Sequence, residues 1–307
     1  MSVVPRPWTA SGARLDWAVD GHDWPNRASS RFVDAGGLRW HVQVMGRGPV
    51  LLLVHGTGAS THSWRALAPR LAAHFTVVAP DLPGHAFTDP LPPGRVSLVA
   101  MAAALQAFLD VLAQKPAMAV GLSAGAAILA RMVLDQGIAP ALLVSLNGAL
   151  LPLPGVPGVI FAPMAKLLAA SPLTARLFAW RAADDRAIAR LIASTGSSLD
   201  AEGQALYARL VRNPAHVAHV LAMMANWDLR PMLSELGQLP TSLALLVATR
   251  DRTVPPAEAR RVQSLLPAAR VIEMGELGHL AHEERPEQVA GLLLELAAGQ
   301  KIMGRNA

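Results

Sequence analysis

Short, almost continuously apolar runs alternate with longer helical patterns through most of this sequence. Runs of this kind are typical of strands that are covered on both faces of a parallel sheet. The alternation predicts an α/β protein with a mostly parallel, twisted, doubly wound sheet flanked by helices. The predicted strands are Val50–Val54, Thr76–Ala79, Ala117–Val120, Ala141–Leu146, Ser242–Ala248 and Arg270–Met274, and the predicted helices are Trp64–Ala73, Leu98–Leu112, Ala124–Leu134, Pro256–Leu266 and Pro286–Ala297.

Two other segments depart from this alternation. Arg31–Asp34 and Leu38–Met45 flank Ala35-Gly36-Gly37, which predicts a β-hairpin. From about residue 151 to 236 several prolines are followed by helical patterns and no convincing strand. We therefore predict an N-terminal extension (1–30) that packs on the body, an α/β core (31–150 and 237–307) and an inserted helical cap (151–236). The predicted cap helices are Ala162–Ala170, Ala183–Ala193, Ala201–Arg212 and Pro214–Trp227.

The composition is apolar for a soluble enzyme, with 52% hydrophobic and 16% charged residues and a mean hydropathy of +0.33. We expect part of this excess to line a pocket or to contact a membrane. No apolar run reaches the roughly 18 residues that a spanning helix needs, and the first residues lack the apolar centre of a signal peptide. These features predict a cytoplasmic protein with at most peripheral membrane contact.

Charge and cysteine content exclude several classes of function. The net charge of +5 is spread along the chain, and with one Tyr and six Phe a nucleic-acid-binding surface is not expected. The chain has no cysteine, which excludes disulfides, thiolate catalysis and cysteine-based metal sites and fits a reducing compartment.

One serine follows an apolar run and precedes a helical pattern. Gly121-Leu122-Ser123-Ala124-Gly125 has the Gly-x-Ser-x-Gly pattern. The strand-to-helix turn that exposes such a serine is so tight that larger side chains two residues away on either side would clash. The pattern and its placement therefore predict Ser123 as a nucleophile, with Gly121 and Gly125 supporting the turn.

A glycine-rich loop follows the predicted strand Val50–Val54. In His55-Gly56-Thr57-Gly58 the glycines permit close backbone approach. The Thr57 amide can point at an oxyanion beside the amide of Ala124. The alternative is a structural Gly-rich turn. In either case we expect His55 to brace the loop and not to react.

An acid and a base follow the last two predicted strands. Asp251 lies just past Ser242–Ala248, and His279 lies just past Arg270–Met274. Loops at the carboxyl ends of neighbouring parallel strands meet at one edge of the sheet, and Ser…Asp…His is the order that the α/β-hydrolase fold uses. Each residue alone has a structural alternative, a surface ion pair for Asp251 or a turn contact for His279. Together they predict a Ser123–Asp251–His279 triad.

Together these motifs resemble the α/β-hydrolase superfamily from about Arg31 to Ala297. Many members have Gly after Asp81-Leu82-Pro83-Gly84-His85, where this chain has Ala86. A narrower likeness covers essentially the whole chain and resembles the magnesium chelatase accessory proteins that are encoded with bacteriochlorophyll genes in photosynthetic bacteria. It is carried by Leu15-Asp16-Trp17, Asp23-Trp24-Pro25-Asn26-Arg27, Gly37-Leu38-Arg39-Trp40-His41-Val42-Gln43 and His55-Gly56-Thr57-Gly58-Ala59-Ser60-Thr61-His62-Ser63-Trp64.

This resemblance implies a role near the insertion of Mg²⁺ into protoporphyrin IX. A small apolar or tetrapyrrole ligand and magnesium chelatase are the partners it suggests, and no cofactor is expected. Between Pro152 and Arg230 eight basic and five acidic residues suit an anionic porphyrin, but they equally suit ordinary solvated helix faces. His216 and His219 could line a tetrapyrrole, although packing of a cap helix is the simpler interpretation. We expect no metal site, because no carboxylate or third histidine shares their spacing.

Three functions remain open at this point. The first is a serine hydrolase of the esterase type. The second is a non-enzymatic tetrapyrrole carrier or chelatase helper that retains the triad as inherited architecture. The third is a serine ester or carbon–carbon bond hydrolase with an unrelated substrate.

Overall fold

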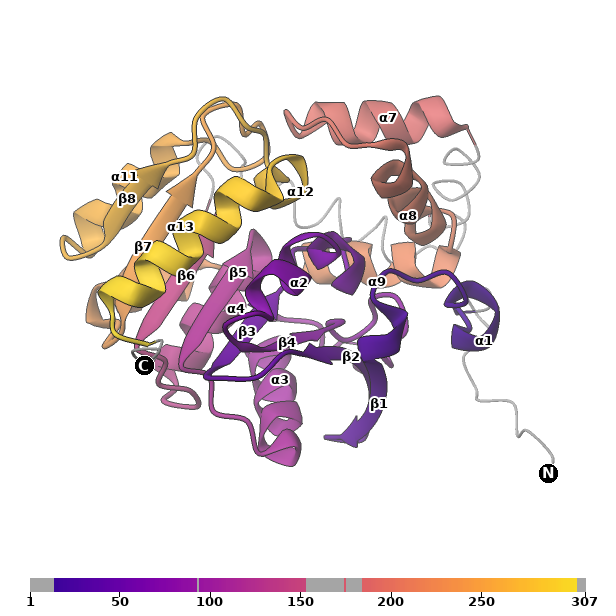
Figure 1. The fold of residues 1–307 in the computed structure, drawn as a ribbon, viewed down its shortest axis with the longest axis horizontal. Helices are drawn as coiled ribbons and strands as arrows, with labels where there is room; N and C mark the ends of the chain where they lie inside the picture. The colour runs from indigo at the N-terminus through magenta and orange to yellow at the C-terminus, as the bar shows by residue number, and fades with distance from the viewer. Residues whose placement is uncertain (1–13, 93, 153–173, 175–183, 303–307) are drawn as a thin grey trace.

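A single twisted sheet of eight strands runs through the computed structural model, with helices on both of its faces (Figure 1). The structure describes residues 14–92, 94–152, 174 and 184–302. The strands are β1 (Ser30–Ala35), β2 (Leu38–Met45), β3 (Val50–Val54), β4 (Thr76–Pro80), β5 (Met118–Leu122), β6 (Leu142–Leu146), β7 (Ser242–Val247) and β8 (Arg270–Glu273).

The strand order is β1-β2-β4-β3-β5-β6-β7-β8. β2 is antiparallel to both β1 and β4, and every other neighbouring pair is parallel. The mostly parallel α/β sheet predicted from the sequence is therefore confirmed. The carboxyl ends of β3, β5, β6, β7 and β8 consequently open onto the same edge.

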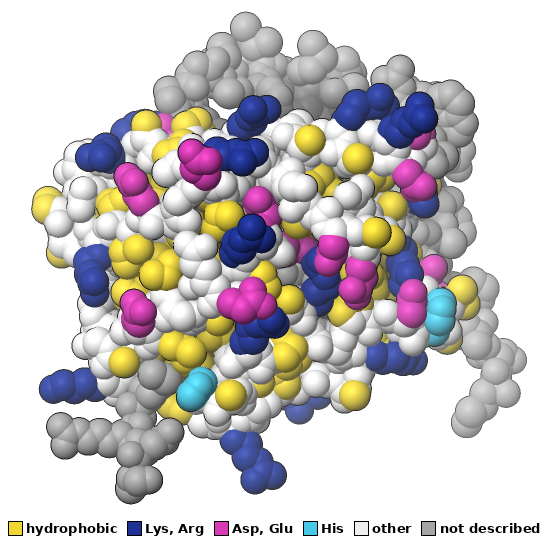
Figure 2. Space-filling model, turned by 45° about the horizontal axis from the view of Figure 1, so that its top comes forward, with side chains coloured by type: hydrophobic (Ala, Val, Ile, Leu, Met, Phe, Trp, Pro, Cys, Tyr) yellow, Lys and Arg dark blue, Asp and Glu magenta, His cyan; other side chains and the backbone are white. Residues whose placement is uncertain are grey.

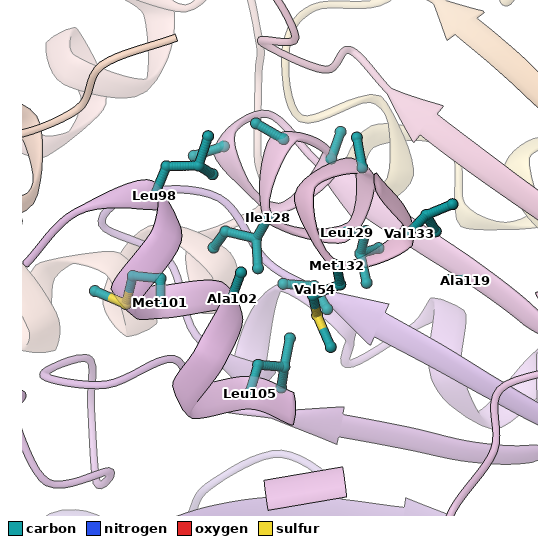
Figure 3. Packing of buried hydrophobic residues seen from close by; sticks show 14 of the residues in the cluster. Val54, Leu98, Met101, Ala102, Leu105, Ala119, Ile128, Leu129, Met132 and Val133 are labelled. Atoms are coloured by element: carbon teal, nitrogen blue, oxygen red, sulfur yellow. The ribbon is translucent and has the colours of Figure 1, made fainter. Parts of the chain in front are cut away.

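Each face of the sheet carries its own apolar layer. Leu52 and Val54 of β3 belong to one layer, and Leu51 and Leu53 belong to the other, as the two-residue period of a strand requires. The first layer is closed by α3 (Leu98–Leu112), α4 (Ala124–Leu134) and α11 (Ala257–Leu265), and the second by α2 (Leu67–Leu71) and α13 (Pro286–Gly299). Figure 3 shows side chains of α3 and α4 packed around Val54.

Helix boundaries follow local chemistry. α3 begins where the Ser97 hydroxyl accepts a hydrogen bond from the Ala100 amide, and it ends at Ala113, whose backbone is left-handed (φ 51°). The helix predicted over Trp64–Ala73 is shorter in the structure, where a 3₁₀ turn at Thr61–Trp64 precedes α2. Pro69 explains the difference, since it has no N–H to donate to the Arg65 carbonyl and is tolerated only in the first turn.

Several α-helices lie between β6 and β7 in the described chain, followed by a 3₁₀ turn at Leu236–Gln238. These helices are α7 (Asp185–Ser194), α8 (Ala201–Val211), α9 (Pro214–Ala225) and α10 (Arg230–Glu235). Asp184, Asp200 and Asn213 accept backbone hydrogen bonds at the starts of α7, α8 and α9, which satisfies amides that a helix start leaves unpaired. The predicted helix Ala162–Ala170 lies outside the described residues. Among the described helices, none is long and apolar enough to cross a membrane.

Residues 14–29 lie against both the core and the helices between β6 and β7. Trp24 is buried, and its indole N–H donates to the Thr61 hydroxyl at 3.1 Å. The Asp23 carboxylate accepts two hydrogen bonds from the Arg209 guanidinium of α8, at 2.6 and 2.8 Å. This segment, which includes α1 (Trp17–Asp20), therefore joins two parts of the molecule that are distant in sequence.

Basic and acidic side chains are mixed on the face that Figure 2 draws, where Lys and Arg alternate with Asp and Glu between apolar areas. Ion pairs between such side chains occur elsewhere in the described residues too, as in Arg70–Glu287 and Arg131–Asp135. This face carries no single-sign patch among its described residues, in keeping with the dispersed charge in the sequence.

A buried polar group also joins α8 to the core. The hydroxyl of Tyr207 donates to Glu283 at 2.9 Å, and Arg65 pairs with the same carboxylate. Glu283 lies on the short helix α12 (Ala281–Glu284), and its side chain is fully buried. Burial raises the pKa of Glu283 to about 7, and the neighbouring Arg65 and Tyr207 offset only part of that effect.

Leu105→Ala should destabilise the fold. The side chain is fully buried between α3 and the sheet, so its truncation leaves a cavity and should lower the free energy of unfolding by about 2–5 kcal/mol. Val111→Ala on the same helix removes an exposed side chain and should change it by less than about 0.5 kcal/mol. Urea unfolding checks both values, and equal costs would contradict the assigned packing.

Glu283→Gln should alter how stability depends on pH. Because the pKa of Glu283 in the folded protein lies above the ordinary 4.5, its contribution is fully present below about pH 4.5 and is lost as the pH rises through about 7. The neutral variant should therefore gain stability relative to the wild type between pH 5 and 8, on the order of 2 kcal/mol. Denaturant unfolding at both pH values measures this, and a pH-independent difference would refute it.

Candidate active site

Ser123 lies in the turn between β5 and α4, and its backbone is strained. Its φ of 51° and ψ of −119° belong to a region that side-chain-bearing residues rarely occupy. The turn is held by the Ser123 amide, which donates to the Leu146 carbonyl at 3.1 Å, and by the Ser123 carbonyl, which accepts from Ala126 and Ala149. The serine is thus fixed at the carboxyl edge of the sheet.

The two glycines of the motif have no room for a side chain. A Cβ on Gly121 would lie 2.3 Å from the Ala126 nitrogen, and one on Gly125 would lie 2.2 Å from the Val54 carbonyl oxygen. Both contacts are with backbone atoms, which cannot rotate away. α4 and the turn that holds Ser123 can therefore approach β3 and β5 only because these positions are glycine.

Asp251 and His279 meet as the sequence predicts. The Nδ1 of His279 lies 2.7 Å from the Oδ2 of Asp251, and both side chains are almost fully buried. The other oxygen of Asp251 accepts hydrogen bonds from the amides of Thr253 and Val254, at 2.7 and 2.9 Å. The carboxylate is thus oriented by three donors, and Nε2 is the ring atom left for chemistry.

The Ser123 hydroxyl and the Nε2 of His279 belong to loops at the same edge of the sheet, but no hydrogen bond joins these two atoms. Neither atom has a hydrogen-bond partner among the described residues. The third link of the predicted triad, from hydroxyl to imidazole, therefore stays a prediction. Nucleophile–base contacts of this kind are often longer before a substrate is bound.

The loop after β3 passes directly against the serine. A Cβ on Gly56 would lie 3.0 Å from the Ser123 Cβ, and Gly58 has a left-handed backbone (φ 81°). Ala124 is the first residue of α4, so its amide lies at a helix N-terminus. No acceptor for the amides of Thr57 or Ala124 occurs among the described residues, so the predicted oxyanion role of these amides stays a prediction.

His55 has both ring nitrogens engaged by the backbone. Its Nδ1 lies 2.8 Å from the Gly56 carbonyl oxygen, and its Nε2 accepts from the Leu82 amide at 2.9 Å. Burial lowers the pKa of His55, against the opposing charge of Asp81. A neutral ring with both positions occupied links two loops and has no free nitrogen for proton transfer.

The loop that contains Asp81 borders the same region. Asp81 accepts from His41 at 2.7 Å and from the Thr61 amide at 2.7 Å. Ala86 adopts a left-handed backbone with φ 41°, which is the conformation that a glycine accepts more readily. Its methyl group lies in an apolar cluster with Trp24 and Phe87.

Helix α9 covers the loop after β3. The Thr57 hydroxyl donates to the Met223 sulfur at 3.7 Å. His216 is buried, accepts from the Ala86 amide at 3.2 Å and lies 3.3 Å from the Gly58 carbonyl oxygen. Burial lowers the pKa of His216 to about 4, so its ring is neutral at pH 7. These contacts favour helix packing over an exposed ligand surface for this histidine.

No group of three or more metal-binding side chains occurs in the described ranges. His219 lies against Gly84 and is hydrogen-bonded to its own helix at the Ala215 carbonyl. The described residues around Ser123 therefore offer a serine hydroxyl, a hydrogen-bonded histidine–aspartate pair and two backbone amides as candidate catalytic groups.

Sequence reasoning missed one residue that holds the site together. Asn147 follows β6, and its side-chain nitrogen donates to the carbonyls of Gly278 and His279 at 3.2 and 3.0 Å. Its side-chain oxygen accepts from the Ala248 amide at 2.8 Å. Its position directly after a predicted strand, shared with Ser123 and the loop of Asp251, is the signal that could have found it.

Comparisons with known proteins identify the family of the chain. The sequence model of the alpha/beta hydrolase family matches residues 51–292. The chain is 37% identical over 279 residues to the Magnesium-chelatase 30 kDa subunit of Rhodobacter capsulatus, which covers 90% of this chain and 97% of that protein. It is 27% identical to the pimeloyl-[acyl-carrier protein] methyl ester esterase of Vibrio vulnificus, over 84% of this chain and 97% of the relative.

A solved structure shares the fold. The thermophilic esterase from Thermogutta terrifontis superposes with a TM-score of 0.71 at 20% identity, over 88% of this chain and 98% of that one. At this level of identity the likeness concerns the fold alone. By the family match and by its similarity to the chelatase subunit over nearly its whole length, the chain belongs to the alpha/beta hydrolase family.

Proposed function

We propose that this protein is a serine hydrolase that cleaves an ester. The observation that supports this most is the buried Asp251–His279 pair beside a strained Ser123 turn. A backbone strain of this kind is retained where the surrounding structure enforces it, and such positions cluster at active sites. The esterase among the relatives is in keeping with the proposal.

In the proposed reaction His279 accepts the hydroxyl proton of Ser123 at Nε2 as the oxygen attacks the ester carbonyl. Asp251 holds the ring in the tautomer with the proton on Nδ1 and stabilises the imidazolium. The amides of Thr57 and Ala124 bind the negative oxygen of the tetrahedral intermediate. The intermediate collapses, and the alkoxide leaves with the proton from His279.

The acyl group is then released by water. His279 takes a proton from the water molecule, whose oxygen attacks the acyl carbon. The new intermediate breaks its bond to Ser123, and the serine oxygen regains its proton from His279. An acid and an alcohol are the products, and no cofactor is consumed.

For the biological setting we propose bacteriochlorophyll or porphyrin metabolism, near the insertion of Mg²⁺ into protoporphyrin IX. The support is the similarity to a magnesium chelatase subunit over 90% of the chain. An apolar or tetrapyrrole ester is the corresponding substrate class, and a cytoplasmic location with docking to the chelatase is part of the same proposal.

The second candidate function is a non-enzymatic chelatase helper. It is favoured by the name of the Rhodobacter capsulatus relative, which describes a magnesium-chelatase subunit and not a hydrolase. In this case Ser123 would be dispensable, and the protein would act through binding alone.

A fluorophosphonate probe should label the wild type, and Ser123→Ala should abolish labelling because the attacking oxygen is gone. His279→Gln should slow labelling by about 10²–10⁴-fold, since general base catalysis is lost. Ser198→Ala, which removes an exposed hydroxyl, is the matched control and should label at the wild-type rate. Gel fluorescence over time gives the rates, and a folded but unlabelled wild type would rule the hydrolase out.

Complementation separates the two candidate functions. A photosynthetic bacterium that lacks its own copy of this gene should recover bacteriochlorophyll with the wild-type gene, and Ser123→Ala should fail if hydrolysis is the role. Pigment absorbance of extracted cells measures recovery, with immunoblots to confirm equal protein. Full recovery with Ser123→Ala would favour the helper and contradict the hydrolase.

A further inference from the structure

The linker between α7 and α8, residues Thr195–Leu199, reaches the loops of both Asp251 and His279. The Thr195 carbonyl accepts hydrogen bonds from the amides of Arg252 and His279, each at 3.2 Å. The Ser197 hydroxyl accepts from the Leu280 amide at 2.8 Å. One short linker thus contacts the residue after Asp251, His279 itself and the residue after it.

The packing at this linker leaves no free space. Gly196 has a left-handed backbone (φ 85°), and a Cβ on it would lie 2.0 Å from the Arg250 carbonyl oxygen. A Cβ on Gly278 would lie 2.3 Å from the Gly196 carbonyl carbon and 2.4 Å from the Ser197 Oγ. Two glycines, one on each side, allow the backbones to come together.

With these contacts, the side chain, the carbonyl and the amide of His279 each have a hydrogen-bond partner. Its side chain is held by Asp251, its carbonyl by Asn147 and its amide by Thr195. The Ser197 hydroxyl then binds the amide of the next residue, Leu280, and Ser197 as a whole residue is 5% exposed. Two of these restraints come from the core, and two come from the segment between β6 and β7.

We propose that Ser197 is a positioning residue for His279, so that the seating of the α7–α8 linker on the core sets the orientation of the base. This inference rests on the proposed function, because it assigns His279 its role as base. Removal of the Ser197 hydroxyl leaves the buried Leu280 amide without its acceptor. The loop should then shift to satisfy that amide, and the imidazole shifts with it.

The test compares Ser197→Ala with Ser198→Ala, which removes a neighbouring exposed hydroxyl. Ser197→Ala should slow fluorophosphonate labelling about tenfold or more, and Ser198→Ala should leave the rate unchanged. Proton NMR provides a readout that does not require activity. The downfield Nδ1 proton resonance of the His279–Asp251 hydrogen bond, identified by its loss in His279→Gln, should move or broaden in Ser197→Ala alone.

The outcomes distinguish this inference from the proposed function. A folded wild type that is not labelled would overturn the hydrolase, whereas the resonance would still test the positioning of the imidazole. An unchanged labelling rate and an unchanged resonance in Ser197→Ala would overturn the inference. If Ser197→Ala does not fold, hydrogen exchange on the wild type decides: the Leu280 amide should be protected, and exchange at the rate of an open loop would overturn the inference.

Discussion

The turn at Ser123 can exist only where backbones approach more closely than any side chain would allow. A Cβ on Gly121 or Gly125 would lie only about 2 Å from a backbone atom of a neighbouring segment. The absence of a side chain at these two positions therefore sets how closely α4 can approach the strands beneath it. The strained positive φ of Ser123 occurs at that approach. The first apolar layer supplies the free energy that holds the turn in this state, since burial of α4 against the sheet offsets the local strain.

The other parts of the candidate site depend on the direction of the strands. Because β3, β5, β6 and β7 are parallel, the loops that carry Thr57, Ser123, Asn147 and Asp251 leave from one edge. Each loop is then tied to its neighbour through side chains that bond backbone groups. Asn147 bonds to both of the loops that follow β7 and β8, and His55 bonds to the loop that follows β4. The loops at this edge of the sheet are therefore joined to one another by hydrogen bonds.

The sheet and the position of each candidate site residue after a strand could be predicted because they depend on local pattern. Three elements have the predicted bounds, namely Val50–Val54, Leu98–Leu112 and Ala124–Leu134. Their bounds could be predicted because they depend on apolar periodicity and capping residues within or next to each element. The Asp251–His279 contact followed from strand order. The contacts of Thr195 and Ser197 could not be predicted, because they depend on how the segment between β6 and β7 sits on the core. The left-handed Ala86 is intermediate: a glycine is expected there, but its methyl is retained by packing with Trp24 and Phe87.

The position of β2 in the sheet shows that the folding domain extends beyond the N-terminal limit of the family match. The family match begins at residue 51, yet β2 pairs with β4 from Val42–Pro80 to Met45–Val77 and covers that side of the sheet. A recombinant fragment cut at the family boundary would lack β1 and β2 and would leave β4 as an open edge with unpaired amides and carbonyls. Such an edge is a template for intermolecular strand pairing, so the excised fragment is expected to aggregate even though every residue of the candidate site is retained.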